Sequence, residues 1–157
     1  MSLEIEVGRF LGGRRETLAI AESLTGGLVA SRVTDVPGAS AYLLEAVVAY
    51  SNAAKVRLLG VREAAIEAHG AVSEQVAREM AEGVRERAGA TWGLSTTGIA
   101  GPTGATATKP VGLVFVAVAG PGGTAAERHL LGGDRATVKA SAAEAALRLL
   151  TDRLRAA

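Results

Sequence analysis

A serine-containing segment, Glu22-Ser23-Leu24-Thr25-Gly26-Gly27, lies between a short apolar run and a stretch that predicts a helix. The start of a helix presents free backbone N–H groups and the positive end of the helix dipole, and both favour anions and oxyanions. The two glycines would let a ligand approach the backbone closely. Ser23 or Thr25 could instead be only the N-cap of this helix, which is the commoner role for such a pattern. The segment matches neither the GxxxxGK[ST] phosphate loop nor the GxSxG nucleophile elbow.

A lysine-containing segment, Tyr50-Ser51-Asn52-Ala53-Ala54-Lys55, follows a second apolar run. If Ser51 caps a helix here, Tyr50 and Lys55 occupy two positions that usually hold an apolar pair. Helical side chains lean toward the N-terminus, so Lys55 can reach the strand end where Tyr50 lies. The helix dipole is unfavourable for a cation there and should lower the pKa of Lys55, which would suit a general base. The alternative is a solvated lysine lying over the ring of Tyr50.

A long loop rich in glycine and proline, residues 98–110, begins directly after Thr97. Loops of this length in a compact domain are often functional, and open α/β sheets bind ligands at the carboxyl ends of their strands. Three predicted strand ends are rich in Gly, Ser and Thr, and they follow Ala21, Ala49 and Thr97. We therefore predict that these three strand ends share one pocket.

The segment Gly132-Gly133-Asp134-Arg135 predicts the start of the last helix, with Asp134 as its N-cap. Arg135 in the first turn opposes the helix dipole, so it is either an ordinary helix residue or a residue that holds a phosphate or carboxylate. His69 and His129 have no second ligand at metal-binding spacing, and we interpret neither as catalytic or metal-binding.

Hydrophobic periodicity and turn residues predict the elements that position these segments. Helices are expected over residues 3–15, 26–36, 51–60, 62–68, 73–88 and 134–154, and strands over 17–21, 42–49, 90–97, 111–119 and 124–131. This order indicates a single-domain α/β fold over residues 1–157, a three-layer α/β/α sandwich with a mixed sheet. The run 111–119 is apolar throughout, which is typical of a central strand, and 124–131 is expected nearer an edge.

Composition restricts the classes of function. The chain has 157 residues, 48% of them hydrophobic, and a net charge of +1, which excludes a largely disordered chain and gives no reason to expect nucleic-acid or membrane binding. The absence of cysteine excludes disulfides and thiolate chemistry. The N-terminus does not resemble a signal peptide and no apolar stretch reaches ~18 residues, so we expect a cytoplasmic protein.

Several motifs together carry a resemblance to a known family. AESLTGG, AYSNAAKVRLLGV, HGAVSE, TTGIAGP, KPVG and GDR occur in the order and spacing of the C-terminal domain of the competence-damage-inducible protein CinA. The resemblance runs from about Leu18 to Arg135 and continues as a helix to the end. That family includes stand-alone nicotinamide-nucleotide amidohydrolases, and we expect this chain to correspond to the stand-alone form. The resemblance implies an α/β/α sandwich, in agreement with the pattern of elements.

The resemblance implies hydrolysis of the carboxamide of nicotinamide mononucleotide to nicotinate mononucleotide and ammonia. It makes Ser23 the nucleophile and Lys55 the base, with Tyr50 as a third catalytic residue. It assigns substrate binding to Thr25, Gly26, Gly27, Thr97, Gly98, Gly101 and Arg135. We expect the oxyanion to lie against N–H groups near Gly26 and Gly27, and Arg135 or a helix N-terminus to hold the 5′-phosphate. No metal or cofactor is required.

The sequence departs from the family pattern at two places. Leu24 stands where the family often has cysteine, and Thr97 and Thr103-Gly104-Ala105 replace a serine and an acidic residue that are often found in the loop. These changes leave Ser23 and Lys55 in place.

Two other hypotheses remain open. The chain could be a non-catalytic nucleotide-binding or protein-interaction module linked to competence or the DNA damage response, or an amidase for another small amide. The expected partner is a small-molecule nucleotide, with no nucleic acid and no membrane. We also expect a homo-oligomer, most simply a dimer, because many glycines and alanines on the helices permit close subunit packing.

Overall fold

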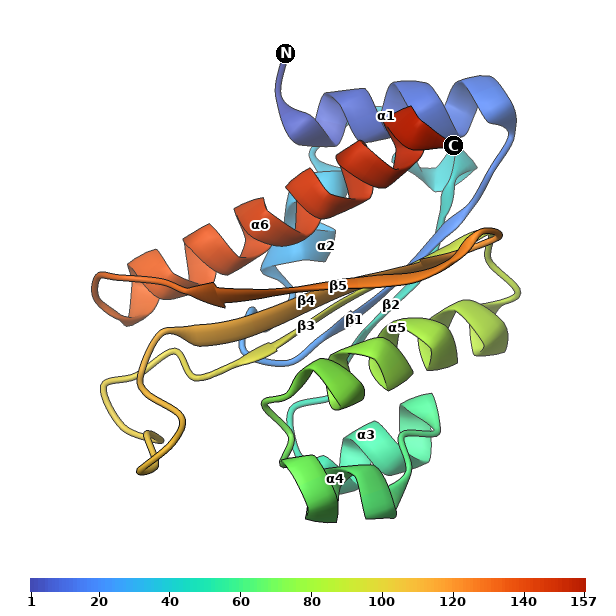
Figure 1. The fold of residues 1–157 in the computed structure, drawn as a ribbon. Coiled ribbons are helices and arrows are strands. Elements are labelled where there is room, and N and C mark those ends of the chain that lie inside the picture. Colours follow the sequence, from blue (N-terminus) through green and yellow to red (C-terminus); the bar gives the residue numbers. More distant parts are fainter.

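The computed structural model describes all residues, 1–157, as a five-stranded sheet with helices on both faces (Figure 1). The strands are β1 (Leu18–Glu22), β2 (Leu43–Val48), β3 (Trp92–Gly98), β4 (Leu113–Gly120) and β5 (Gly123–Leu130). The helices are α1 (Leu3–Arg14), α2 (Leu28–Thr34), α3 (Asn52–Leu59), α4 (Glu63–His69), α5 (Glu74–Ala88) and α6 (Arg135–Ala156), with a short 3₁₀ helix η1 (Ala39–Ala41). Helices α1, α2 and α6 cover one face, and α3, α4 and α5 cover the other. The predicted three-layer sandwich is confirmed.

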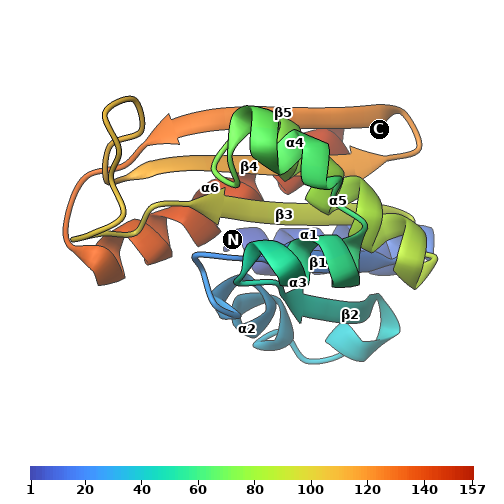
Figure 2. The same cartoon turned by 90° about the horizontal axis from the view of Figure 1, so that it is seen from below.

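The sheet has the order β2-β1-β3-β4-β5. Strands β1, β2 and β3 are parallel, whereas β4 and β5 run antiparallel to their neighbours, so the sheet is mixed. The carboxyl ends of the three parallel strands therefore meet at one edge. The loop between β3 and β4 and the start of α6 lie at the same edge (Figure 2).

Besides shifts of one or two residues at several element ends, the structure differs from the sequence prediction in the start of α2 and in an additional 3₁₀ helix. The helix predicted from residue 26 begins at Leu28, because Gly26 and Gly27 have φ angles of +60° and +107°, which a helix does not contain. The short turn η1 was not predicted, because three residues after Pro37-Gly38 are too few to show a period.

The core lies on both sides of the sheet. Along β1, Leu18 and Ile20 face the layer of α1, α2 and α6, while Ala19 and Ala21 face the layer of α3 and α5. Small residues let α5 approach closely: a Cβ added at Gly93 of β3 would lie 2.2 Å from the carbonyl oxygen of Ala81. No helix is long and apolar enough to cross a bilayer.

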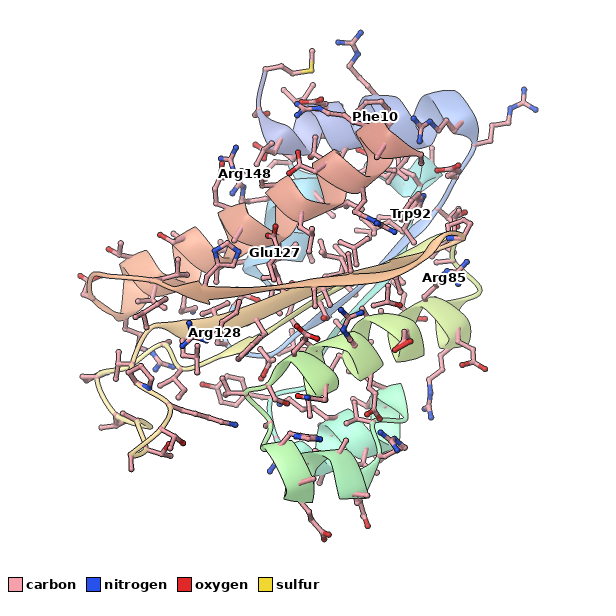
Figure 3. All side chains as sticks on the ribbon, viewed as in Figure 1. Phe10, Arg85, Trp92, Glu127, Arg128 and Arg148 are labelled. Carbon is pink, nitrogen blue, oxygen red and sulfur yellow. The ribbon has the colours of Figure 1, made fainter.

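The amino ends of the strands are closed by paired polar groups. The ring of Trp92 is buried at the start of β3, between the sheet and the layer of α1 and α6 (Figure 3). Its Nε1–H donates to Glu16 over 2.7 Å. The opposite edge, where the parallel strands end, is the one that carries a pocket.

Candidate active site

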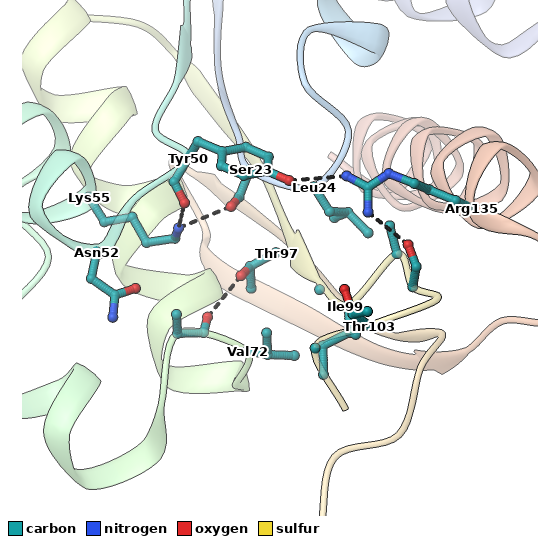
Figure 4. Close-up of a pocket in the computed structure, with 15 residues that line it drawn as sticks. Ser23, Leu24, Tyr50, Asn52, Lys55, Val72, Thr97, Ile99, Thr103 and Arg135 are labelled. Atoms are coloured by element: carbon teal, nitrogen blue, oxygen red, sulfur yellow. Dashed lines mark hydrogen bonds between the residues drawn. The ribbon is translucent and has the colours of Figure 1, made fainter. Parts of the chain in front are cut away.

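Ser23 and Lys55 meet at the carboxyl ends of β1 and β2 (Figure 4). The Nζ atom of Lys55 lies 3.0 Å from Oγ of Ser23, within reach of direct proton transfer. Only 2% of the Lys55 surface is exposed, and Ser23 is also buried, at 7%. A solvated lysine lying over a tyrosine ring is therefore wrong for this chain.

The start of α3 places Lys55 as predicted. The hydroxyl of Ser51 accepts the backbone N–H of Ala54 over 3.0 Å, so Ser51 is the N-cap and Lys55 lies in the first turns. The Nζ atom also reaches the carbonyl oxygens of Ala49 and Tyr50, at 3.0 and 3.1 Å. In the neutral amine these two carbonyls take its two N–H groups, which leaves the lone pair to accept the hydroxyl proton of Ser23.

Burial lowers the pKa of Lys55 from 10.5 to about 8, because a charged amine is less stable away from water. The direction agrees with the sequence prediction, but the cause is burial rather than the helix dipole. A fraction of the lysine is thus neutral near physiological pH, as a general base requires.

The side chain of Glu22 determines how the chain turns after Ser23. Its carboxylate is fully buried and accepts three backbone N–H groups at the start of α2, those of Gly27, Val29 and Ala30. The N–H of Gly26 donates to the carbonyl of Ser23. The N–H groups of Gly26 and Gly27 are therefore engaged within the chain, which corrects the expectation that they stabilise an oxyanion.

The N–H of Leu24 is the group left over in this turn. It makes no hydrogen bond within the chain, and Leu24 lines the pocket directly after Ser23. The N–H of the residue that follows a nucleophile is a common oxyanion donor, and the Leu24 N–H, unlike those of the two glycines, is free for such a role.

Thr25 also differs from its expected role. It is 1% exposed, and its hydroxyl lies 2.8 Å from that of Thr96 on β3. The Thr96 hydroxyl in turn accepts the N–H of Ser23 over 3.4 Å. Thr25, Gly26 and Gly27 do not line the pocket. Thr25 therefore ties the Ser23 turn to β3 rather than meeting a ligand.

The pocket has a volume of about 310 Å³ and joins the three strand ends, the loop after β3 and the start of α6. The expected site residues that it brings together are Ser23, Tyr50, Lys55, Thr97, Gly98, Gly101 and Arg135. The lining residues that sequence reasoning missed are Leu24, Asn52, Ala71, Val72, Ile99, Ala100, Thr103 and Gly104. Asn52 could have been found, because it lies three residues before Lys55 on one helical face. Ala71 and Val72 carry no such signal.

Arg135 bridges the pocket from the first turn of α6 (Figure 4). Its guanidinium donates to the carbonyl of Gly101 over 2.8 Å and to the hydroxyl of Tyr50 over 3.2 Å. Asp134 caps this helix through the N–H of Thr137, as predicted. The Tyr50 hydroxyl therefore lies on Arg135, while its backbone carbonyl contacts Lys55. This arrangement puts the phenol on the Arg135 side of the pocket rather than at the Ser23–Lys55 pair.

The charge of the pocket suits an anionic ligand. Lys55 and Arg135 are its two charged lining residues, and no carboxylate lines it. No group of three or more His, Cys, Asp or Glu side chains is arranged to hold a metal ion. The arrangement therefore offers a buried serine–lysine pair, an unpaired N–H beside the serine and a cationic side chain at the opposite wall.

The family model of the CinA C-terminal domain matches residues 1–154 of this sequence. The chain belongs to this family. The resemblance inferred from the motifs is thereby confirmed. A "CinA-like protein" of Anaeromyxobacter sp. (strain Fw109-5) is 58% identical over 92% of this chain. A protein of the same description from Chlorobaculum tepidum is 56% identical over 99% of it. The chain spans only 35% and 38% of these two relatives.

Solved structures of the same family have the same fold. Competence damage-inducible protein A (ComA) from Klebsiella pneumoniae is similar with a TM-score of 0.94 and 37% identity, covering 98% of this chain and 95% of that one. The competence/damage-inducible protein CihA from Agrobacterium tumefaciens gives a TM-score of 0.91 at 35% identity, with the same coverage of both chains. Unlike the longer relatives, these solved chains match this one over almost their whole length.

Proposed function

We propose that the chain hydrolyses the carboxamide of nicotinamide mononucleotide to nicotinate mononucleotide and ammonia, with Ser23 as nucleophile and Lys55 as base. The observation that carries the proposal is the buried amine of Lys55, 3.0 Å from the Ser23 hydroxyl inside a pocket. An amide is a poor electrophile, and a covalent route divides its hydrolysis into two easier steps.

In the first step neutral Lys55 removes the hydroxyl proton of Ser23, and Oγ bonds to the carboxamide carbon. The electron pair of the C=O bond moves to its oxygen, which becomes an oxyanion beside the Leu24 N–H. A well-placed donor at this point stabilises the transition state by ~3 kcal/mol. The carbonyls of Ala49 and Tyr50 hold the amine so that its lone pair faces Ser23.

In the second step the C–N bond breaks, Lys55 returns its proton to the departing nitrogen, and ammonia leaves. The product of this step is an ester between Ser23 and the nicotinoyl group. Water then attacks the ester and gives a proton to Lys55. The C–O bond to Ser23 breaks, the lysine returns the proton to Oγ, and the acid is released. The sum of the steps is amide plus water to acid plus ammonia.

The charge of the pocket supports a nucleotide substrate. Arg135 lies at the wall opposite Lys55 and has N–H groups that suit a phosphate. A phosphate there would compete for the guanidinium with the carbonyl of Gly101 and the hydroxyl of Tyr50. The motifs that this chain shares with stand-alone amidohydrolases of the family support the same substrate.

The test is ammonia release from nicotinamide mononucleotide by the purified protein, with Ser23→Ala and Ser31→Ala as a matched pair. Ser31 is an exposed serine on α2 outside the pocket. We expect wild type and Ser31→Ala to release ammonia at equal rates and Ser23→Ala to lose about 10³-fold or more. Undiminished release by Ser23→Ala would end the serine mechanism.

Two other outcomes point to the alternative functions. Binding of the nucleotide without ammonia release would indicate a non-catalytic binding module. Release from a panel of small amides irrespective of a nucleotide phosphate would indicate a general amidase. Either result would replace the proposed substrate.

A further inference from the structure

Asn52 is a polar pocket residue for which the mechanism above gives no role. It opens α3 three residues before Lys55, so both side chains project from the same face of the helix. Figure 4 shows its side-chain amide beside the lysine, with no hydrogen bond to another residue of the pocket. By contrast, the hydroxyls of Thr97 and Tyr50 are already bonded, to the carbonyl of Ala71 and to Arg135.

The positions of Leu24 and Lys55 restrict how a carboxamide can lie at Ser23. The carbonyl oxygen must face the Leu24 N–H, where the oxyanion forms. The nitrogen must face Lys55, because the lysine has to return a proton to it. Leu24 and Asn52 lie on opposite sides of the Ser23–Lys55 pair (Figure 4). The nitrogen is therefore directed to the side of the pocket that Asn52 occupies.

We infer that Asn52 determines specificity for the amide, because its Oδ1 accepts an N–H of the substrate carboxamide and holds the nitrogen beside Lys55. The inference rests on the proposed function and adds a residue to it. A primary amide has two N–H groups, and one remains bonded to Asn52 while the nitrogen pyramidalises to take the proton from Lys55. An ester at the same carbon has no N–H for Asn52 to hold.

A neutral side chain at this position is also consistent with the base. An aspartate beside Lys55 would stabilise the ammonium and raise the pKa of the lysine. An asparagine has an acceptor oxygen of the same reach without that charge.

The experiment compares kcat/KM for nicotinamide mononucleotide and for the methyl ester of nicotinate mononucleotide. Both substrates give the same ester with Ser23, so they differ only in the leaving group. We expect Asn52→Ala to lower kcat/KM for the amide about tenfold, as for one lost hydrogen bond to the substrate, and for the ester less than about twofold. Thr103→Ala, which removes a polar side chain elsewhere in the pocket, should leave the amide-to-ester ratio unchanged.

Asn52→Asp provides a second readout that a merely structural role would not change. It should shift the rise of kcat/KM to higher pH on both substrates. An unshifted profile would separate Asn52 from Lys55 and overturn the inference, as would equal losses on amide and ester in Asn52→Ala, or no loss. Wild-type protein inactive on both substrates would instead defeat the proposed function, so the two failures are distinguishable.

Discussion

At the amino ends of β1 and β3 two threonines bond each other reciprocally, whereas at the carboxyl ends of β1 and β2 a backbone N–H remains unpaired and a lysine is buried. The hydroxyl of Thr91 accepts the N–H of Thr17, and the hydroxyl of Thr17 accepts the N–H of Thr91, both over 3.0 Å. At the carboxyl ends, the N–H of the buried Leu24 has no partner within the chain, and Lys55 is buried with no carboxylate beside it in the pocket.

This difference indicates that the pocket edge of the sheet lowers the free energy of unfolding. A buried polar group stabilises only when it is paired, and an unpaired one costs about 1–3 kcal/mol. A lysine whose pKa is lowered from 10.5 to about 8 destabilises the fold by about 3 kcal/mol when it is protonated in both states. The amino-terminal edge of the sheet, with the Thr17–Thr91 pair, is here called the closed end and has no such cost at that pair. The carboxyl-terminal edge, with the pocket, is called the open end.

The largest expected effect is loss of activity when the base is replaced. Lys55→Met keeps the length of the side chain but removes the amine, and Lys55→Arg keeps a cation that cannot act as a base near neutral pH. We expect both to lower kcat for ammonia release by about 10²–10⁴-fold. Steady-state assays with circular dichroism as a control for folding measure this. Activity in the arginine variant would show that charge alone suffices.

The second effect is on stability as a function of pH. Below pH 8 Lys55 is protonated in both folded and unfolded chains, and above about 10.5 it is neutral in both. Between these values the unfolded chain binds more protons, so the free energy of unfolding should rise with pH, by about 3 kcal/mol relative to Lys55→Met. Urea denaturation of both proteins at pH 8 and 10.5 measures the difference. If the free energies of unfolding of wild type and Lys55→Met change equally with pH, the pKa of Lys55 is near its ordinary value.

The third effect is on rate as a function of pH. Only the neutral amine of Lys55 can take the proton of Ser23, and its fraction rises through a pKa of about 8. We expect kcat/KM for ammonia release to increase about tenfold from pH 7 to pH 9 and then to level off. A profile that falls over this range would require a protonated group and contradict the lysine base.

Local sequence signals predict the start of α3. The contacts of residues whose partners are distant in the chain are known only from the structure. Ser51 and the spacing to Lys55 were sufficient to place the lysine, because a cap and a helical turn are set by neighbouring residues. The sequence does not show that the carboxylate of Glu22 accepts N–H groups at the start of α2. That contact depends on the direction in which the side chain projects from β1. Without this contact, the sequence predicts Gly26 and Gly27 as ligand-binding residues.

The fourth prediction compares two threonines on or beside one strand. Thr91→Val at the closed end leaves the Thr17 N–H unpaired and should lower the free energy of unfolding by about 1–2 kcal/mol without changing kcat/KM. Thr96→Val at the open end removes the partner of Thr25 and of the Ser23 N–H, so it should lower both stability and kcat/KM. Equal losses of activity in the two variants would remove the distinction between the ends.

The smallest expected effect comes from the exception at the closed end. Tyr42, just before β2, is 4% exposed, and its buried hydroxyl has no hydrogen-bond partner. That oxygen lies 2.6 Å from where a Cβ at Gly8 of α1 would be, so the helix passes directly over it. Tyr42→Phe removes the unpaired group and should raise the free energy of unfolding by about 1 kcal/mol, with unchanged ammonia release.

Gly8→Ala should lower the free energy of unfolding in the wild type, and should lower it less in the Tyr42→Phe background, because the clash is with the hydroxyl. Thermal denaturation of the four proteins measures this coupling, and additive effects would show that the hydroxyl has moved away from Gly8.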